Sequence, residues 1–233
     1  EILKSRYSTV KTFIFESGEA NKNLNTIEKL YEYLIINYFE RNDLLIALGG
    51  GVVGDMTGFA AATYLSGIDF VQIPTTLLAQ VDSSIGGKTG VDFAQYKNMV
   101  GAFNQPKLVY MNLDVLKTLP KEQFASGMAE ALKSGLIRDQ EYFTYLCDEI
   151  KAIQSLEQEA ILRTVSGSCK IKREVVQNDP KEKGERALLN FGHTIGHAIE
   201  KLSDFTLYHG ECVALGMVAA AYISFKSGNL RKI

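Results

Sequence analysis

The chain has 233 residues, of which 46% are apolar, and a formal net charge of −2 at pH 7. This length and composition can fill one large hydrophobic core or two small ones, and the near-neutral charge argues against a nucleic acid or an anionic membrane surface as partner. Strand and helix signals alternate over the first 75 residues. A β-branched and aromatic run predicts a strand at 12–15, and apolar residues at helical spacing predict a helix over 26–39.

The next strand is predicted from the continuous apolar run 44–48, which is typical of a strand buried on both faces of a parallel sheet. The segment Gly49-Gly50-Gly51-Val52-Val53-Gly54-Asp55 follows it and opens a helix of small residues. Glycines let a diphosphate approach the backbone, and a helix N-terminus offers unpaired N–H groups. The spacing departs from GxGxxG, so this turn alone leaves a nucleotide site and a plain tight turn both open.

A further strand is predicted at 70–73, and a second glycine-rich loop at 82–90 contains Lys88. Lys97 and Asn98 follow closely. Such loops bring ammonium groups and backbone donors to phosphate or carboxylate oxygens, although a single loop lysine is more often simply solvated. Two glycine loops, each downstream of a strand, favour a ligand site.

The second half of the chain is predicted to be helical. A strand at 108–111 closes the α/β part near Pro120, and five helices are expected at 122–137, 141–150, 156–177, 185–202 and 211–226. The sequence therefore predicts an α/β N-terminal domain, residues 1–120, followed by an all-α domain, residues 121–233.

All three histidines fall within one stretch, at positions 193, 197 and 209. His193 and His197 are four residues apart in a helix-favouring run, so both rings share a face, and a break before His209 lets the next helix fold back. Converging imidazoles with a carboxylate suit a divalent transition metal such as zinc, the alternative being three structural histidines. Glu130 and Lys133 also share a helix face, either as a surface ion pair or as a ligand carboxylate beside a catalytic ammonium.

Cysteine usage and hydropathy indicate a cytoplasmic protein. The three cysteines, Cys147, Cys169 and Cys212, form no CxxC pair, which is typical of a reduced compartment. The first twenty residues mix charged with apolar side chains, so no signal peptide is expected. The longest apolar run, 213–223, is shorter than the roughly 20 residues that span a bilayer.

An ordered set of motifs resembles the 3-dehydroquinate synthase family. These motifs are ALGGGVVGDMTGFAAATY, QIPTTLLAQVDSSIGGKTGVD, KNMVGAF, SGMAEALKSGLI, LNFGHTIGHAIE and YHGECVALGM. They extend from about Gly18 to Met217. The resemblance implies a nucleotide-binding α/β domain and a helical metal-binding domain.

The resemblance also implies an activity, cofactors and an assembly. The family converts 3-deoxy-D-arabino-heptulosonate 7-phosphate to 3-dehydroquinate and phosphate in the shikimate pathway, which leads to the aromatic amino acids. It uses NAD and one divalent metal, zinc or cobalt. We therefore expect a lyase with a small phosphorylated sugar-acid substrate, acting as a homodimer.

Position by position, the resemblance implies three groups of site residues. The metal ligands would be Glu130, His193 and His209. The resemblance thus assigns His197 to the substrate and not to the metal. The substrate pocket would be lined by Lys88, Lys97, Asn98, Lys133, Lys172, Arg186, Asn190 and His197. The NAD site would comprise Glu19, Lys22, Gly51, Val52, Val53, Gly54, Asp55, Thr75, Thr76, Asp82 and Thr118, together with Lys88 and Lys97.

Some features depart from the family pattern. Ser66 stands where the family usually has an arginine that reaches across a dimer to the substrate phosphate. The chain begins without Met, and we expect it to lack the family's first strands and its last helices. Two rival hypotheses remain. One is another sugar-phosphate cyclase or a metal-dependent polyol dehydrogenase of the same fold, and the other is a catalytically silent fragment that binds NAD or metal or serves only as an assembly partner.

Overall fold

The computed structural model describes residues 3–7, 9–94, 96–204 and 206–230. The chain forms two compact units. The first, here the α/β unit, comprises Glu1–Ala47, Val52–Gln72 and Gly87–Leu108. The second, here the helical unit, comprises Leu48–Gly51, Ile73–Gly86 and Val109–Ile233. Each unit is described by itself below.

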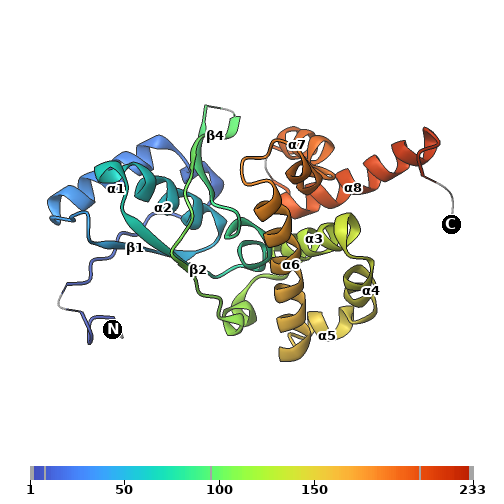
Figure 1. Ribbon diagram of the computed structural model, residues 1–233, viewed down its shortest axis with the longest axis horizontal. Helices are drawn as coiled ribbons and strands as arrows, with labels where there is room; N and C mark the ends of the chain where they lie inside the picture. The colour runs from blue at the N-terminus through green and yellow to red at the C-terminus, as the bar shows by residue number, and fades with distance from the viewer. Residues whose placement is uncertain (1–2, 8, 95, 205, 231–233) are drawn as a thin grey trace. The chain divides into compact units, whose positions relative to one another are not determined.

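The first half of the chain alternates helices and strands, as expected (Figure 1). Its elements are η1 (Glu19–Asn21), α1 (Leu24–Ile36), β1 (Leu44–Gly49), α2 (Gly51–Thr63), η2 (Tyr64–Ser66), β2 (Asp69–Pro74), β3 (Lys88–Phe93), β4 (Tyr96–Phe103) and β5 (Leu108–Val109). One sheet has the strand order β1-β2-β5, and β3 and β4 form a separate antiparallel pair. Helix α1 begins where Asn23, as N-cap, accepts a hydrogen bond from the backbone N–H of Thr26.

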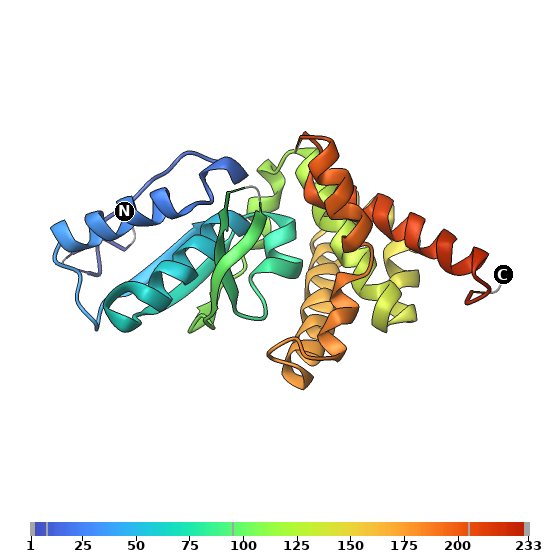
Figure 2. The same cartoon turned by 90° about the horizontal axis from the view of Figure 1, so that it is seen from above.

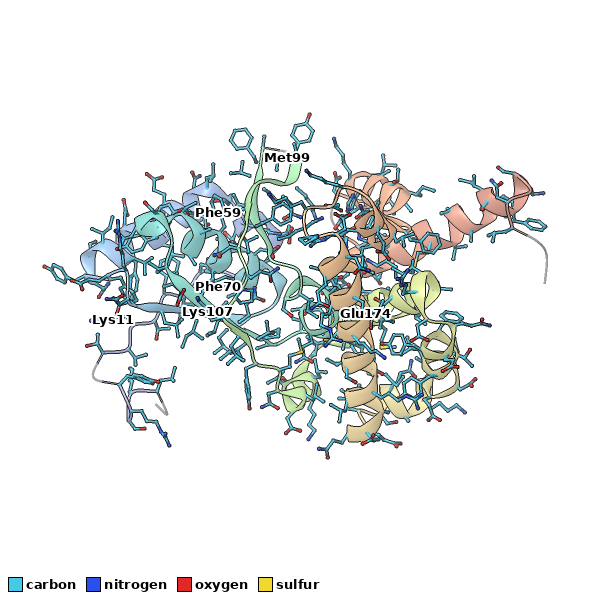
Figure 3. All side chains as sticks on the ribbon, in the orientation of Figure 1. Lys11, Phe59, Phe70, Met99, Lys107 and Glu174 are labelled. Carbon is cyan, nitrogen blue, oxygen red and sulfur yellow. The ribbon has the colours of Figure 1, made fainter. Side chains whose placement is uncertain are left out.

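The α/β unit buries aromatic side chains from both helix and strand. Phe59 on α2 and Phe70 on β2, both labelled in Figure 3, are 8% and 1% exposed. Leu45 on β1 belongs to the same cluster as Phe70. Strand side chains alternate between the two faces of a sheet, and β1 buries only one of its faces. The prediction that 44–48 is buried on both faces was therefore wrong, since Ile46 is 39% exposed and Leu48 64%.

Two other local predictions in this half were wrong. Residues 12–15 form no strand, because β-branched and aromatic composition alone does not supply a pairing partner. The predicted loop at 82–90 ends earlier than expected, because β3 begins at Lys88 and pairs with β4 in the register Lys88↔Phe103 and Gly90↔Gly101. Gly90 permits this pairing, since a Cβ there would lie 2.7 Å from the carbonyl oxygen of Val100.

The second half of the chain is helical, as expected. After η3 (Ala79–Ser83) and η4 (Leu113–Thr118) come α3 (Lys121–Arg138), α4 (Gln140–Asp148), α5 (Ile150–Gln154), α6 (Gln158–Asn178), η5 (Glu185–Asn190), α7 (His193–Leu202) and α8 (His209–Lys226). Its main hydrophobic cluster includes Leu77, Leu116, Leu146 and Ile153, each at most 1% exposed. Among the described residues, no helix is both long and apolar enough to span a bilayer.

The single helix predicted for 185–202 is broken into η5 and α7. The break falls at Gly192, whose φ of +79° lies in the left-handed region that favours glycine. A Cβ at Gly192 would lie 2.5 Å from Met217 Cγ on α8, so the turn also needs a residue without a side chain. Helix α7 consequently begins at His193 and lies beside α8 (Figure 2).

Candidate functional site

Helix α3 supplies a buried ion pair to the helical unit. Glu130 and Lys133 are 1% and 2% exposed, and the Lys133 ammonium contacts Glu130 Oε2. The pair is therefore not a surface ion pair. Burial alone would lower the pKa of Lys133, but attraction by Glu130 and Asp82 raises it, so this ammonium stays protonated.

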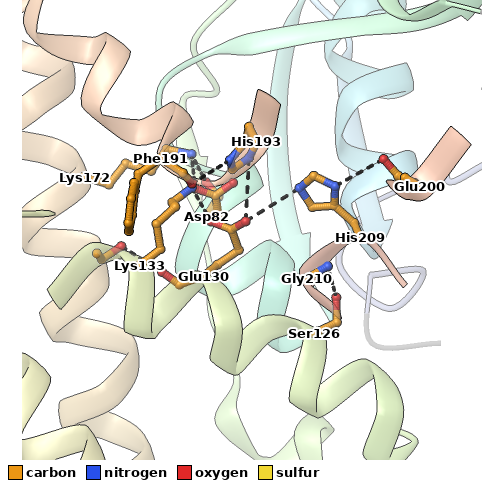
Figure 4. Close-up of polar contacts among 11 residues, drawn as sticks. Asp82, Ser126, Glu130, Lys133, Lys172, Phe191, His193, Glu200, His209 and Gly210 are labelled. Carbon is orange, nitrogen blue, oxygen red and sulfur yellow. Dashed lines mark hydrogen bonds and ion pairs between the residues drawn. The ribbon is translucent and has the colours of Figure 1, made fainter. Parts of the chain in front are cut away.

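Two histidines face the other oxygen of Glu130. The Nε2 atoms of His193 and His209 lie 3.8 and 3.6 Å from Glu130 Oε1 (Figure 4). Each histidine is the first residue of its helix, α7 or α8, and a helix N-terminus disfavours positive charge on a side chain. The ring centroids are 5.3 Å apart. The structure thus brings together the three residues that the resemblance assigns to the metal.

The approach of α8 to α3 depends on Gly210. Its backbone N–H donates a 2.9 Å hydrogen bond to Ser126 Oγ on α3 (Figure 4). A Cβ at Gly210 would lie 2.0 Å from the carbonyl oxygen of Ser126, far inside van der Waals contact. Because His209 directly precedes Gly210 in the chain, this close approach of α8 to α3 sets the distance from His209 to Glu130.

Gly210→Ala is therefore expected to destabilise the protein and weaken metal binding. Overpacking typically costs about 1–3 kcal/mol, whereas glycine to alanine in an open helix position stabilises by up to about 1 kcal/mol. Urea unfolding and a zinc titration measure the two effects. Val218→Ala, on the same helix at a 70% exposed position, is the control: it should leave metal binding unchanged and alter stability by less than about 1 kcal/mol. A more stable Gly210→Ala protein would show that α8 can move away from α3 freely.

The two histidines differ in their electrostatic surroundings. Burial and the positive charge of Lys133 lower the pKa of His193 to about 4, so its imidazole is neutral at pH 7. For His209, burial also lowers the pKa, but the carboxylates of Glu200 and Glu130 more than offset this and raise it. The negative charge around His209 favours a cation at this place, either a proton or a metal ion.

A second ion pair joins α6 to η3. Lys172 donates 2.7 Å hydrogen bonds to both the backbone oxygen and Oδ1 of Asp82. Burial would raise the pKa of Asp82, but Lys172 and Lys133 lower it well below its usual range. Lys172, assigned by the resemblance to the substrate, therefore contacts Asp82, assigned to NAD.

The remaining substrate candidates of the helical unit are spread over η5 and α7. Arg186 is 2% exposed and donates hydrogen bonds to the carbonyl oxygens of Pro180 and Gly86. Asn190 is exposed and donates to Glu182 Oε1. His197 is also exposed, with its ring centroid 5.3 Å from that of His193 and 5.9 Å from that of His209. All three histidine rings thus cluster, as the sequence predicted.

The α/β unit holds its own polar cluster around Lys22. This buried ammonium donates to Asp55 Oδ2 at 2.7 Å and to Asn98 Oδ1 at 2.6 Å, and lies 3.8 Å from Glu19 Oε1. Burial would lower its pKa, but Asp55 and Glu19 raise it. Lys97 lies 3.7 Å from Glu19 Oε1. The cluster joins residues that the resemblance assigns to the NAD site with Asn98, which it assigns to the substrate pocket.

The glycine turn places α2 directly after β1, as the sequence predicted. The backbone N–H of Thr75 donates to the carbonyl oxygen of Gly49, and Thr76 Oγ1 accepts from the backbone of Ala79. A Cβ at Gly51 would lie 2.9 Å from Ser83 Oγ, so a larger residue at the start of α2 would require the Ser83 hydroxyl to turn away. Helix α2 begins at Gly51, and the unpaired N–H groups in the first turn of a helix are suited to bind an anion.

The other candidates lie at the surface of their units. Lys88 begins β3 and is exposed. Thr118 ends η4, and its hydroxyl donates to the carbonyl oxygen of Val115. Ser66 is exposed, and its φ of +67° places it in the left-handed region.

The donor set on α3, α7 and α8 fits a divalent transition metal. One carboxylate oxygen and two imidazole nitrogens lie within 4.8 Å of one another, and Glu130 Oε1 is buried without a hydrogen-bond partner. Ligand atoms about 2.1 Å from a tetrahedral zinc are roughly 3.4 Å apart. This is close to the 3.8 and 3.6 Å between Glu130 Oε1 and the Nε2 atoms of His193 and His209. A bound cation would satisfy the otherwise unpaired carboxylate oxygen.

Sequence reasoning missed one acidic residue of this site. Glu200 is 3% exposed, and its Oε2 lies 3.7 Å from His209 Nδ1 (Figure 4). The signal was the His197-x-x-Glu200 spacing, which places the two side chains on one face of α7.

Comparison with known proteins gives the family. The N-terminal model of 3-dehydroquinate synthase matches residues 12–126, and the C-terminal model matches residues 127–233. A 3-dehydroquinate synthase of Acetivibrio thermocellus is 54% identical over 211 residues, which is 91% of this chain and 59% of that protein. One of Nostoc punctiforme is 52% identical over 99% of this chain and 64% of its own length. The chain thus spans about three fifths of these relatives.

Solved structures agree with this assignment. A 2-deoxy-scyllo-inosose synthase in complex with carbaglucose-6-phosphate, NAD+ and Co2+ superposes with a TM-score of 0.87 at 32% identity, over 94% of this chain and 59% of that one. A 2-epi-5-epi-valiolone synthase of Streptomyces hygroscopicus, with NAD+ and Zn2+ bound, gives 0.87 at 29% identity over 92% and 60%. A probable glycerol dehydrogenase of Sinorhizobium meliloti, at 16% identity and a TM-score of 0.69 over 99% and 68%, shares the fold alone.

The fold is therefore that of the sugar-phosphate cyclases, an α/β part followed by a helical part. Within this class, the chain belongs to the 3-dehydroquinate synthase family.

Proposed function

We propose that the protein converts 3-deoxy-D-arabino-heptulosonate 7-phosphate to 3-dehydroquinate and phosphate, as a lyase of the shikimate pathway to the aromatic amino acids. The 54% identity to the 3-dehydroquinate synthase of Acetivibrio thermocellus supports the proposal. The structural observation that carries it is the convergence of Glu130, His193 and His209 next to the buried ammonium of Lys133.

The proposed activity needs NAD and one divalent metal, zinc or cobalt. Glu130, His193 and His209 would hold the metal, which when bound would polarise a substrate hydroxyl as a Lewis acid. NAD would supply a hydride acceptor and later a hydride donor. The proposed NAD site consists of Glu19, Lys22, Gly51, Val52, Val53, Gly54, Asp55, Thr75, Thr76, Asp82 and Thr118, with Lys88 and Lys97. The N-terminus of α2 directly after β1 supports this site, because the first turn of a helix offers unpaired N–H groups to a diphosphate.

The chain's own residues would act mainly through charge and position. A substrate with a carboxylate and a phosphate needs several cationic partners, and the proposed substrate residues supply them. These are Lys88, Lys97, Asn98, Lys133, Lys172, Arg186, Asn190 and His197. A buried ammonium such as Lys133 is worth more than an exposed one, because low dielectric strengthens its attraction to a substrate anion. Because Lys22 can only donate, Asn98 turns its amide oxygen toward Lys22 and keeps its amide nitrogen for an acceptor on the substrate.

The proposal predicts that NAD acts catalytically. Protein given the heptulosonate phosphate, zinc or cobalt, and substoichiometric NAD should release many phosphates per NAD. Absorbance from free NADH should stay near zero, since the hydride returns to the substrate framework within each cycle. Phosphate release and NADH absorbance can be followed in one cuvette.

The alternatives give different readouts in the same experiment. NADH that rises with substrate loss, without phosphate, would establish a polyol dehydrogenase. Phosphate released faster from another sugar phosphate than from the heptulosonate would establish a different cyclase. Binding of NAD or metal with neither product would establish a silent fragment.

We also propose that the protein works as a homodimer in the cytoplasm. The family resemblance supports the dimer, and reduced cysteines far apart in the chain support the compartment. Light scattering coupled to size exclusion should give twice the monomer mass, and a monomer mass at micromolar concentration would refute the dimer. Cell fractionation should recover the protein with cytoplasmic markers.

A further inference from the structure

The two histidines of the proposed metal site are held in the same way. In each ring Nε2 faces Glu130 Oε1, and Nδ1 faces an acceptor on the opposite side. His193 Nδ1 lies 3.2 Å from the carbonyl oxygen of Phe191. His209 Nδ1 lies 3.7 Å from Glu200 Oε2, a few tenths of an ångström longer than a hydrogen bond.

An acceptor opposite Nδ1 decides which ring nitrogen carries the proton. A neutral imidazole has one N–H and one lone pair, and the N–H goes to the nitrogen that faces the acceptor. The lone pair is then on Nε2. For both histidines this aims the lone pair at the space beside Glu130 Oε1.

We propose that Glu200 is a positioning residue of the metal site, which accepts the Nδ1 proton of His209 and so presents Nε2 to the metal. The inference rests on the proposed metal dependence, and it concerns a residue that touches neither metal nor substrate. Glu200 is 3% exposed, so its carboxylate acts at low dielectric, where a charged acceptor holds an N–H more firmly than in water. The acceptor that faces His209 Nδ1 is a charged carboxylate, whereas the acceptor that faces His193 Nδ1 is a neutral carbonyl. His209 is therefore the stronger electron donor of the two.

A competing arrangement would make Glu200 itself a ligand. His197, Glu200 and His209 also place one ligand atom each within 4.8 Å of one another, with His209 using Nδ1. One imidazole cannot serve both positions unless it loses both ring protons. Glu130 Oε1, buried and without a hydrogen-bond partner, favours the position beside Glu130, because the metal satisfies that atom there.

The test measures metal affinity, independently of turnover. Dissociation constants for Zn2+ and Co2+ are obtained by competition with a chromophoric chelator, and the visible spectrum of the Co2+ form reports the ligand field. Glu200→Ala should weaken binding by about 10–100-fold and shift the Co2+ bands. Glu200→Gln keeps a hydrogen-bond acceptor without the charge, so it should lose less metal affinity than Glu200→Ala.

The matched control is Glu211→Gln, which removes the same charge two residues from His209. Glu211 Oε2 accepts a 2.8 Å hydrogen bond from the backbone N–H of Tyr208. The Glu211→Gln variant should have a metal affinity and a Co2+ spectrum near those of the wild type. Circular dichroism and thermal unfolding confirm that each variant is folded.

Two outcomes overturn the inference. Wild-type affinity and spectrum in folded Glu200→Ala would remove Glu200 from the site. Loss of stoichiometric metal in Glu200→Gln and in His197→Ala alike would make Glu200 a ligand. If wild-type protein binds one metal per chain but releases no phosphate, the proposed function fails while this inference stands or falls on the affinities.

Discussion

His193→Ala and His209→Ala are each expected to abolish stoichiometric binding of zinc or cobalt, whereas His197→Ala should retain it. The first two side chains aim Nε2 at Glu130 Oε1, at 3.8 and 3.6 Å, and a catalytic site with three protein ligands tolerates no loss among them. Loss of a residue that hydrogen-bonds a metal ligand typically lowers metal affinity about 10–100-fold, so loss of a ligand itself should lower the affinity by more than about 100-fold. Metal analysis after gel filtration gives ions per chain.

His197→Ala is the matched control, because it removes the same side chain from the same histidine cluster. His197 is exposed and begins no helix. It should keep about one metal per chain and lose turnover, in keeping with a role toward the substrate. Loss of the ion from His197→Ala, with full retention in His193→Ala, would place the metal with Glu200 and refute the assignment to Glu130.

Much of this site could be predicted because its residues carry local signals. The glycine turn after β1, the histidine spacing and the helical second half follow from periodicity and from residue types with few other roles. The choice of Glu130 as third ligand came only from the family resemblance. Nothing near it in sequence distinguishes its pair with Lys133 from a surface ion pair, because burial is a property of the tertiary fold.

The failures have the same physical origin. Residues 12–15 have strand composition but no pairing partner, and β3 arises from a partner strand that the glycine-rich pattern concealed. The break at Gly192 exists because α7 packs closely on α8, which a search for helix periodicity does not register. Glu200 was overlooked because its importance depends on His209, which belongs to another helix.

Lys133→Met is expected to lower turnover by about 100-fold to 10,000-fold while the metal stays bound. An ammonium that stabilises developing negative charge or moves a proton contributes roughly this much. Removing a positive charge beside the metal position also removes repulsion, so metal affinity should be unchanged or tighter. Metal content and phosphate release, measured on the same sample, separate the two effects.

The same variant should make the protein's stability depend more strongly on metal than it does in the wild type. Without Lys133, the carboxylate of Glu130 is buried and uncompensated in the metal-free protein, which typically costs about 3–5 kcal/mol. A divalent cation restores the compensation. The rise in unfolding temperature on adding zinc should therefore be larger for Lys133→Met than for wild type.

Lys117→Met provides the matched control, since Lys117 and Asp114 also form an ion pair three residues apart. Their side chains are 65% and 75% exposed, and such surface pairs contribute about 0–1 kcal/mol. This variant should match wild type in turnover, metal content and metal-dependent stability. If Lys133→Met instead loses the metal, the ammonium is needed to hold Glu130 in place as a ligand. If Lys133→Met turns over at the wild-type rate, Lys133 serves only to neutralise a buried carboxylate, and the substrate anion is bound by other cations.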